Sequence, residues 1–235
     1  MFTFKQFSLS DSECAMKIGT DGVLLGSFAA NYPCSRVLDV GTGCGLLALM
    51  IAQKTQAIID GIEIEENAAG QAAANFKQTP WTHRLFAHHI SLQKFATNAE
   101  KKYDLVVSNP PFFKGSLNSQ YHPRNLARHD HSLSFNELFA HTRQLMINHG
   151  ILLIIYPADA EQLMDQTAKE NLFSAAKKVY IYPTPGHSAR RIISEFHIKP
   201  VAQLKKESII IESGIRHQYT SDYKKLTFDY HPFWK

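Results

Sequence analysis

The sequence predicts an α/β protein whose core is a doubly wound, Rossmann-like sheet, mostly parallel with a C-terminal antiparallel hairpin. Three patterns lead to this prediction. Short apolar runs alternate with helical segments, which is typical of parallel strands joined by right-handed crossovers. Residues 151–156 are apolar throughout, as expected for a strand with both faces covered. Residues 179–182 and 192–198 are strand-like and flank a turn rich in proline at 183–186, which predicts the hairpin.

The elements before the hairpin follow one another in a regular order. Strands are expected at 36–40, 57–64, 85–89, 103–107 and 151–156, and helices at 22–31, 46–54, 65–77, 92–101, 135–148 and 157–171. Ser134 is expected to cap the helix that follows it, with Glu137 in the first turn, and His149-Gly150 to close that helix.

Composition and charge exclude some classes of protein. The N-terminus lacks the basic and apolar regions of a signal peptide, and the longest apolar runs are too short to span a membrane. Cys14, Cys34 and Cys44 are odd in number and lack metal-ligand spacing, so we expect a cytoplasmic protein without a metal. The net charge is +4, and residues 176–235 carry 11 Lys/Arg against 5 Asp/Glu. This basic end is compatible with a polyanionic partner such as RNA or with a solvated surface.

A glycine-rich loop follows the first of these strands and begins the next helix. Asp39 precedes three glycines at alternating positions, Gly41, Gly43 and Gly45, and Glu63 ends the following strand. Glycines let the backbone approach a ligand closely, and a helix N-terminus offers unpaired N–H groups. A carboxylate about twenty residues after the loop can accept both hydroxyls of a ribose. The pattern therefore indicates a nucleotide cofactor at the carboxyl edge of the sheet.

The spacing of the glycines favours one nucleotide cofactor over another. Dinucleotide sites use GxGxxG, whereas an acid followed by alternating glycines resembles the motif that binds S-adenosylmethionine. That cofactor has no pyrophosphate, so the loop would cradle its amino-acid tail, with Asp39 near the ammonium group. NAD binding and a loop that serves only strand–helix packing are the alternatives.

The turn Asn109-Pro110-Pro111-Phe112 directly follows the strand at 103–107. An exocyclic amine is a poor nucleophile because its lone pair is conjugated, and two acceptors on its N–H groups offset the positive charge that develops during attack. The Asn109 side-chain oxygen and the Pro110 carbonyl can be those acceptors, while Phe112 can stack on a planar substrate. Together with the glycine loop, the turn predicts methyl transfer to an amino nitrogen by in-line displacement. An ordinary proline-rich turn is the alternative.

Beyond these motifs, nearly the whole chain resembles the bacterial tRNA1(Val) (adenine-37-N6)-methyltransferases. The specific likeness lies at the two ends, because the central motifs are shared with many methyltransferases. The matching segments are Phe4-Lys5-Gln6-Phe7, Ala15 to Gly26, Asn109 to Gly115, Ala127-Arg128-His129 and Tyr219 to Thr227. The resemblance implies a class I methyltransferase fold in a single domain over 1–235. Residues 1–35 would be an N-terminal extension covering the cofactor cleft, and 36–235 the Rossmann-like core.

The resemblance also implies the reaction and some of its residues. The methyl group of S-adenosylmethionine would pass to N6 of adenosine 37, beside the anticodon of a valine tRNA. Thr20 and Asp21 match a segment that lies over the cofactor, although Asp21 could simply cap the helix at 22–31. Asn109 would contact the cofactor as well as the substrate. Many relatives carry an acid near the cofactor adenine where this chain has Ser91, which can still accept from the adenine amine.

Basic side chains are the candidates for contacts with RNA phosphates. They are Lys17, Arg124, Arg128, His129, Arg190, Arg191, Lys224 and Lys225, and plain solvent exposure is the alternative for each. The histidines after the Asn-Pro-Pro-Phe turn match no common zinc-ligand spacing. We expect the protein to be a monomer that binds tRNA and does not bind a membrane.

Two other amino-methylating enzymes and one non-enzyme are competing interpretations. A protein-glutamine N5-methyltransferase uses a similar turn, usually with tyrosine in place of Phe112, and has an N-terminal helical domain for which about 35 residues are too few. A ribosomal RNA guanine N2-methyltransferase is usually longer. An RNA-binding module that had merely retained the fold would not need Asp39, Glu63 and Asn109 together.

Overall fold

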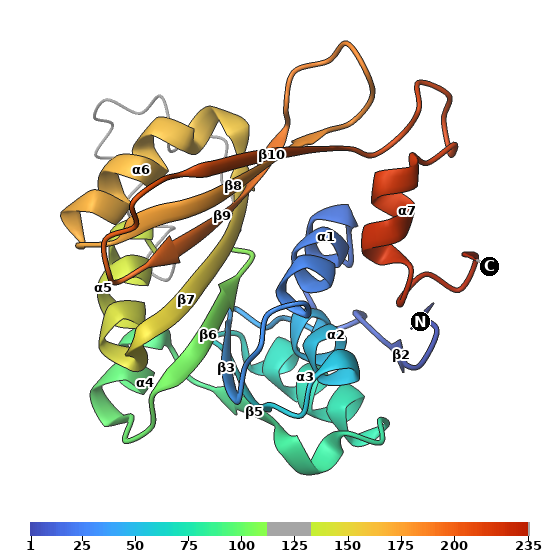
Figure 1. The fold of residues 1–235 in the computed structure, drawn as a ribbon. Coiled ribbons are helices and arrows are strands. Elements are labelled where there is room, and N and C mark those ends of the chain that lie inside the picture. The colour runs from blue at the N-terminus through green and yellow to red at the C-terminus, as the bar shows by residue number, and fades with distance from the viewer. Residues whose placement is uncertain (112–132, 235) are drawn as a thin grey trace, which may run out of the picture.

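The computed structural model describes residues 1–111 and 133–234 and has three layers, with a sheet between two sets of helices (Figure 1). The sheet has eight strands in the order β10-β8-β9-β7-β6-β3-β4-β5. These strands are β3 (Arg36–Val40), β4 (Ile58–Glu63), β5 (Leu85–His89), β6 (Tyr103–Ser108), β7 (Met146–Pro157), β8 (Ser174–Tyr182), β9 (Arg191–His197) and β10 (Lys205–Ile210). A separate hairpin pairs β1 (Phe2–Thr3) with β2 (Ser8–Leu9).

Helices cover both faces of the sheet. They are α1 (Thr20–Ala29), α2 (Leu46–Lys54), α3 (Glu66–Lys77), α4 (Leu92–Asn98), α5 (Phe135–Leu145), α6 (Glu161–Glu170) and α7 (Ser221–Thr227), with short 3-10 turns η1 (Thr82–Arg84) and η3 (Ala158–Ala160). Helices α1, α2 and α3 lie on one face and α4, α5 and α6 on the other, while α7 packs against α1 (Figure 1). In the ranges that the structure describes, no helix combines the length and apolarity needed to cross a membrane.

Alternate residues of the central strands enter two separate cores. In β6, Leu105 and Val107 join the core on the side of α1, α2 and α3, whereas Val106 joins the core on the side of α4, α5 and α6. In β7, Leu153 joins the first of these cores and Leu152 joins the second. Side chains of a strand point alternately to opposite faces, so a sheet covered on both faces needs apolar residues at every position. This explains the uninterrupted apolar run from which the strand was predicted.

The strand directions confirm the predicted fold class. Pairing is parallel from β7 through β6, β3 and β4 to β5, and β9 is antiparallel to both β7 and β8. The hairpin predicted at the end of the sheet is therefore β8–β9. Strand β10, which pairs parallel with β8 at the edge, was not predicted, and neither were α7 and the β1–β2 hairpin.

The helix that follows Ser134 begins as predicted. Ser134 Oγ accepts a hydrogen bond from the Glu137 N–H at 3.2 Å, and the Glu137 carboxylate accepts one from the Ser134 N–H at 3.0 Å. These two bonds form a capping box, which satisfies donors that the first turn of a helix leaves unpaired.

The predicted end of the same helix is wrong. Helix α5 ends at Leu145, and β7 begins at Met146 rather than at residue 151. Gly150 is therefore a strand residue, and a Cβ on it would lie 3.1 Å from the Tyr103 carbonyl oxygen. Met146 pairs with Tyr103 across an irregular stretch of the β6–β7 register. Pairing between strands has overridden the local helical pattern of residues 146–148.

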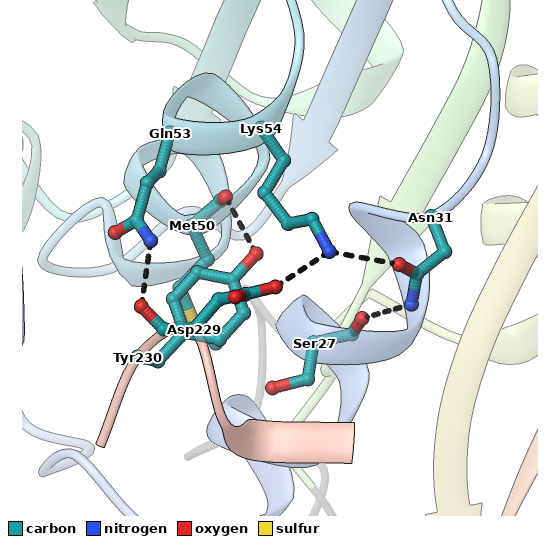
Figure 2. A network of polar contacts seen from close by, with 7 residues as sticks. All are labelled: Ser27, Asn31, Met50, Gln53, Lys54, Asp229 and Tyr230. Atoms are coloured by element: carbon teal, nitrogen blue, oxygen red, sulfur yellow. Dashed lines mark hydrogen bonds and ion pairs between the residues drawn. The ribbon is translucent and has the colours of Figure 1, made fainter. Parts of the chain in front are cut away.

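Polar contacts anchor the segment after α7 to α2 and, through Lys54, to Asn31 just after α1 (Figure 2). The Tyr230 side chain is 1% exposed, and its hydroxyl donates to the Met50 carbonyl at 2.9 Å. Lys54 pairs with Asp229 at 2.7 Å and donates to the Asn31 side-chain oxygen at 3.1 Å. The C-terminal segment thus binds the helix that follows the glycine loop, and Lys54 of that helix links it to the end of α1.

Removal of the Tyr230 ring is expected to destabilise the protein measurably. Tyr230→Ala should lower the free energy of unfolding by roughly 3–5 kcal/mol because it leaves a cavity. Tyr230→Phe, which removes only the hydrogen bond, should cost about 1 kcal/mol. Urea unfolding measures both. Phe233→Ala is the matched control, because the Phe233 ring is 77% exposed and its loss should change little. Equal losses in the two alanine variants would contradict the prediction.

Candidate active site

Two predicted site segments meet at the carboxyl edge of the sheet. Strand β3 lies between β4 and β6, and its last residue, Val40, pairs with Ile62 on one side and Ser108 on the other. The Ser108 hydroxyl also donates to the Val40 carbonyl at 2.9 Å. Gly41 and Asn109 follow these paired residues, so they leave neighbouring strands side by side. Ligands of open α/β sheets bind at this edge, beyond the strand ends.

The glycine loop has a backbone that favours glycine at all three positions. The φ angles of Gly41, Gly43 and Gly45 are 72°, 53° and 86°, in the left-handed region. A Cβ on Gly45 would lie 2.4 Å from Phe76 Cε1, so this glycine also permits close packing on α3. Among the described residues, nothing lies within 4 Å of a Cβ built on Gly41 or Gly43. With respect to the described residues, the loop is therefore packed on one side and open on the other.

Glu63 lies directly beside this loop. Its Oε2 accepts a hydrogen bond from the Gly43 N–H at 2.9 Å, and its Oε1 accepts from the N–H groups of Ile64 and Glu65 at 2.8 and 3.1 Å. These three bonds orient the carboxylate at the end of β4. A carboxylate oxygen has two lone pairs, so Oε2 keeps the capacity to accept a further hydrogen bond from a ligand, whereas Oε1 already accepts two.

Asp39 lies underneath the loop and has no exposed surface. Its Oδ2 accepts a hydrogen bond from Thr42 Oγ1 at 2.7 Å, whereas its Oδ1 accepts none of normal geometry within the described residues. Burial raises the pKa of this carboxyl to about 7, although the Thr42 hydroxyl and the nearby Ala48 amide oppose the shift. Within the described residues, the charge of this buried acid is therefore only partly compensated.

These features fit S-adenosylmethionine. An under-compensated buried carboxylate suits a positively charged amino group, and an open glycine backbone at the start of α2 suits the rest of an amino-acid tail. Glu63 is in reach of the same loop, where a ribose would be bound. No group of three or more His, Cys, Asp and Glu is arranged to hold a metal in residues 1–111 and 133–234.

Asp21 does not cap helix α1, so that alternative is wrong. The N-cap is Gly19, and Asp21 lies with Thr20 in the first turn. Asp21 Oδ2 accepts a hydrogen bond from Arg191 Nε at 2.7 Å, and the two side chains are about one-third exposed. Arg191, a candidate for RNA contact, is therefore also an ion-pair partner that ties α1 to the start of β9. The sequence could not reveal this pair because its members are 170 residues apart.

Ser91 and Lys17 make local contacts in the structure. Ser91 is the N-cap of α4, and its Oγ accepts from the Lys94 N–H at 3.3 Å. The Ser91 oxygen has two lone pairs, so it can accept one more hydrogen bond, and its proton can be donated. Lys17 is exposed, and its ammonium group donates to the carbonyls of Asp11 and Ser12 at 2.7 and 3.1 Å.

Of the remaining candidates for RNA contact, Arg190, Lys224 and Lys225 are in the described part of the chain. Arg190 immediately precedes β9, and Lys224 and Lys225 lie on α7, with the Lys224 ammonium 5.7 Å from the centre of the Trp234 ring. Phe112, Arg124, Arg128 and His129 lie outside the described residues.

The sequence patterns did not predict the roles of two residues in this region. Thr42, inside the glycine motif, bonds the buried carboxylate of Asp39. Asn75 is 1% exposed and donates to the Cys44 carbonyl in the loop at 2.8 Å. A signal for Asn75 did exist: it lies seven residues after Ala68 and three after Ala72, on the face of α3 that those two alanines bury.

Comparison with known proteins defines the class of this chain. Residues 12–180 match the model of the methyltransferase small domain family. A protein of Agrobacterium tumefaciens described as a predicted O-methyltransferase has a similar structure, with a TM-score of 0.69 and 17% identity over 89% of this chain and 96% of that one. The ribosomal protein L11 methylase of Lactobacillus delbrueckii has a TM-score of 0.52 and 18% identity over 74% and 75% of the two chains. The class I methyltransferase fold is confirmed.

The curated relatives define the particular family. The tRNA1(Val) (adenine(37)-N6)-methyltransferase of Parabacteroides distasonis is 37% identical and covers 98% of this chain and 97% of its own length. The protein of that name from Flavobacterium johnsoniae is 39% identical, with 98% and 99% covered. This chain belongs to the tRNA1(Val) (adenine(37)-N6)-methyltransferase family, which confirms the resemblance noted in the sequence. It also confirms S-adenosylmethionine as the cofactor.

Proposed function

We propose that this protein transfers a methyl group from S-adenosylmethionine to the N6 amino group of adenosine 37 in a valine tRNA. The observation that carries the proposal is the register of β3 and β6, which brings Asn109 beside the glycine loop. A methyl donor in the loop and an amine held by the turn would then face each other. The names of the relatives supply the choice of adenine and of tRNA. We expect the protein to act as a monomer in the cytoplasm.

The chemistry that we assign to the turn is the activation of a weak nucleophile. Bound S-adenosylmethionine would supply an electrophilic methyl group, whose bond to sulfur breaks as its bond to N6 forms, with release of S-adenosylhomocysteine and of one proton from the amine. The Asn109 side-chain oxygen and the Pro110 carbonyl accept the two N–H groups of the amine, which favours attack by its lone pair. Pro110 and Pro111 have restricted φ angles, so the carbonyl between them is rigidly aimed. Phe112 is proposed to stack on the adenine ring.

We assign the cofactor to the loop and the segments around it. The negative charge of Asp39, which lies beneath the loop, would attract the ammonium group of the cofactor. Glu63 would accept hydrogen bonds from the ribose hydroxyls. Thr20 and Asp21 would lie over the cofactor as part of an N-terminal extension, residues 1–35, that covers the cleft. Ser91 would meet the adenine amine, with its Oγ shared between that amine and the helix cap.

The proposed substrate is a base in a single-stranded loop. An adenine in an anticodon loop costs less to unstack and extrude than one in a duplex. The basic residues named as candidates for RNA contact would hold the tRNA through its phosphates, and this attraction should weaken as salt is raised.

The experiment that tests this function is nucleoside analysis of methylated tRNA. The protein is incubated with labelled S-adenosylmethionine and bulk tRNA from a strain that lacks the gene, and the tRNA is digested to nucleosides. We expect the label in N6-methyladenosine, and in valine tRNA when single tRNAs are captured. Label only in N2-methylguanosine, or only in protein, would refute the proposal.

A further inference from the structure

The side chain of Asn75 joins the N-terminal segment to the glycine loop. It is buried on α3, where its Nδ2 donates to the carbonyls of Ser10 and Cys44, each at 2.8 Å. Its Oδ1 accepts from the Ser10 N–H at 3.0 Å and from Gln71 Nε2 at 3.3 Å. A carboxamide has two donor protons and an oxygen with two lone pairs, so this amide uses all of its hydrogen-bonding capacity.

The bond to Cys44 holds one peptide group of the loop. Cys44 lies between Gly43 and Gly45, and its carbonyl points toward α3 because Asn75 binds it there. The next N–H, that of Gly45, donates to the Thr42 carbonyl at 2.8 Å, and Thr42 in turn bonds Asp39. Rotation of the peptide between Cys44 and Gly45 would break this chain of contacts. It would also leave a buried carbonyl without a partner, which costs about 1–3 kcal/mol.

The bonds to Ser10 hold the N-terminal segment in the same place. Both backbone groups of Ser10 bind the one side chain, as they would bind a neighbouring strand. Gln71, one turn earlier on α3, adds a second contact because its Oε1 accepts from Ser12 Oγ at 3.0 Å. Gln71 thus binds the N-terminal segment, and the contacts found for its side chain are with Ser12 and Asn75 rather than with the loop.

We propose that Asn75 is a positioning residue of the cofactor site. It keeps the Cys44–Gly45 peptide in the orientation that leaves the open side of the loop available to the cofactor, and it couples that orientation to the docking of residues 10–12. The proposal rests on the proposed function, because it takes the loop to be the cofactor loop. A purely structural role would stabilise α3 without affecting the cofactor.

The test compares Asn75→Leu with Gln71→Leu. The second variant is a matched control, because Gln71 lies on the same helix, also contacts the N-terminal segment and is replaced by the same residue. Calorimetry measures the Kd of S-adenosylmethionine, and steady-state kinetics with tRNA separate KM from kcat. Asn75→Leu should raise the Kd and the cofactor KM roughly ten- to a hundredfold, since its loop peptide is no longer held. The kcat at saturating cofactor should stay within about threefold, because Asn75 is not placed against the substrate. Gln71→Leu should leave the Kd within about twofold.

Hydrogen exchange of the wild-type protein gives a second measurement, which does not depend on whether the Asn75→Leu variant folds. S-adenosylmethionine should slow exchange at the Ser10 N–H together with the amides of residues 41–47. An unchanged Kd in Asn75→Leu, or protection of the loop amides without that of Ser10, would overturn the inference. Wild-type protein that binds no S-adenosylmethionine would overturn both this inference and the proposed function. Cofactor binding without methylation of tRNA would overturn only the proposed function.

Discussion

Asn109→Ala is expected to lower kcat for tRNA methylation roughly a hundred- to a thousandfold. The loss of one preorganised polar group at the reacting centre of an enzyme typically has an effect of this size. The side-chain oxygen of Asn109 is proposed to accept an N–H of the adenine amine in a hydrogen bond that strengthens as the amine becomes positive. Binding of tRNA uses other surfaces, so its Kd should change by less than about threefold. Single-turnover kinetics with labelled cofactor, at tRNA concentrations above the Kd, measure the chemical step directly.

Two controls separate the role of Asn109 in chemistry from other roles. Asn109→Asp keeps an acceptor oxygen at the same position and should retain more activity than the alanine variant. The Kd of S-adenosylmethionine, measured for both variants by calorimetry, reports any contact of Asn109 with the cofactor. A kcat near that of the wild type in Asn109→Ala would show that the turn is not the site of activation. The roles proposed in cofactor binding also stay predictions, for Thr20, Asp21, Asp39, Glu63 and Ser91.

Asp39→Asn is expected to weaken binding of S-adenosylmethionine tenfold or more at pH 8. At that pH the Asp39 carboxyl, whose pKa burial raises to about 7, is ionised and can favour the ammonium group of the cofactor. Asparagine has almost the same shape and can keep the Thr42 hydrogen bond but carries no charge. Calorimetric titrations at pH 6 and pH 8 measure the effect. The wild-type affinity should rise with pH and that of the variant should not, and parallel profiles would contradict the role given to Asp39.

The same substitution should change how stability depends on pH. A carboxyl with a raised folded-state pKa binds more protons folded than unfolded, so stability falls as pH rises from about 4 to about 7 and then levels off. The shift of about three pKa units corresponds to at most about 4 kcal/mol. Urea unfolding of the cofactor-free protein should show this fall in the wild type relative to Asp39→Asn. The difference should shrink when S-adenosylmethionine is present, because the bound cofactor favours the ionised carboxylate.

Much of this protein is determined by short stretches of its sequence. The strand and helix order follows from local periodicity, and the fold class follows from that order. The glycine loop is also local, because positive φ angles at Gly41, Gly43 and Gly45 are favourable only without a side chain. The capping box from Ser134 to Glu137 spans four residues and was visible for the same reason.

Only the tertiary structure decided the features that depend on distant partners. Helix α5 stops early because Met146 pairs with Tyr103, and β10 is a strand because β8 presents an open edge to it. The partner of Asp21 is 170 residues away, and Asn75 joins Ser10, 65 residues away. A local pattern determines which conformation a segment prefers. It cannot determine which distant carbonyl or carboxylate a buried side chain will meet, because that depends on how the whole sheet is assembled.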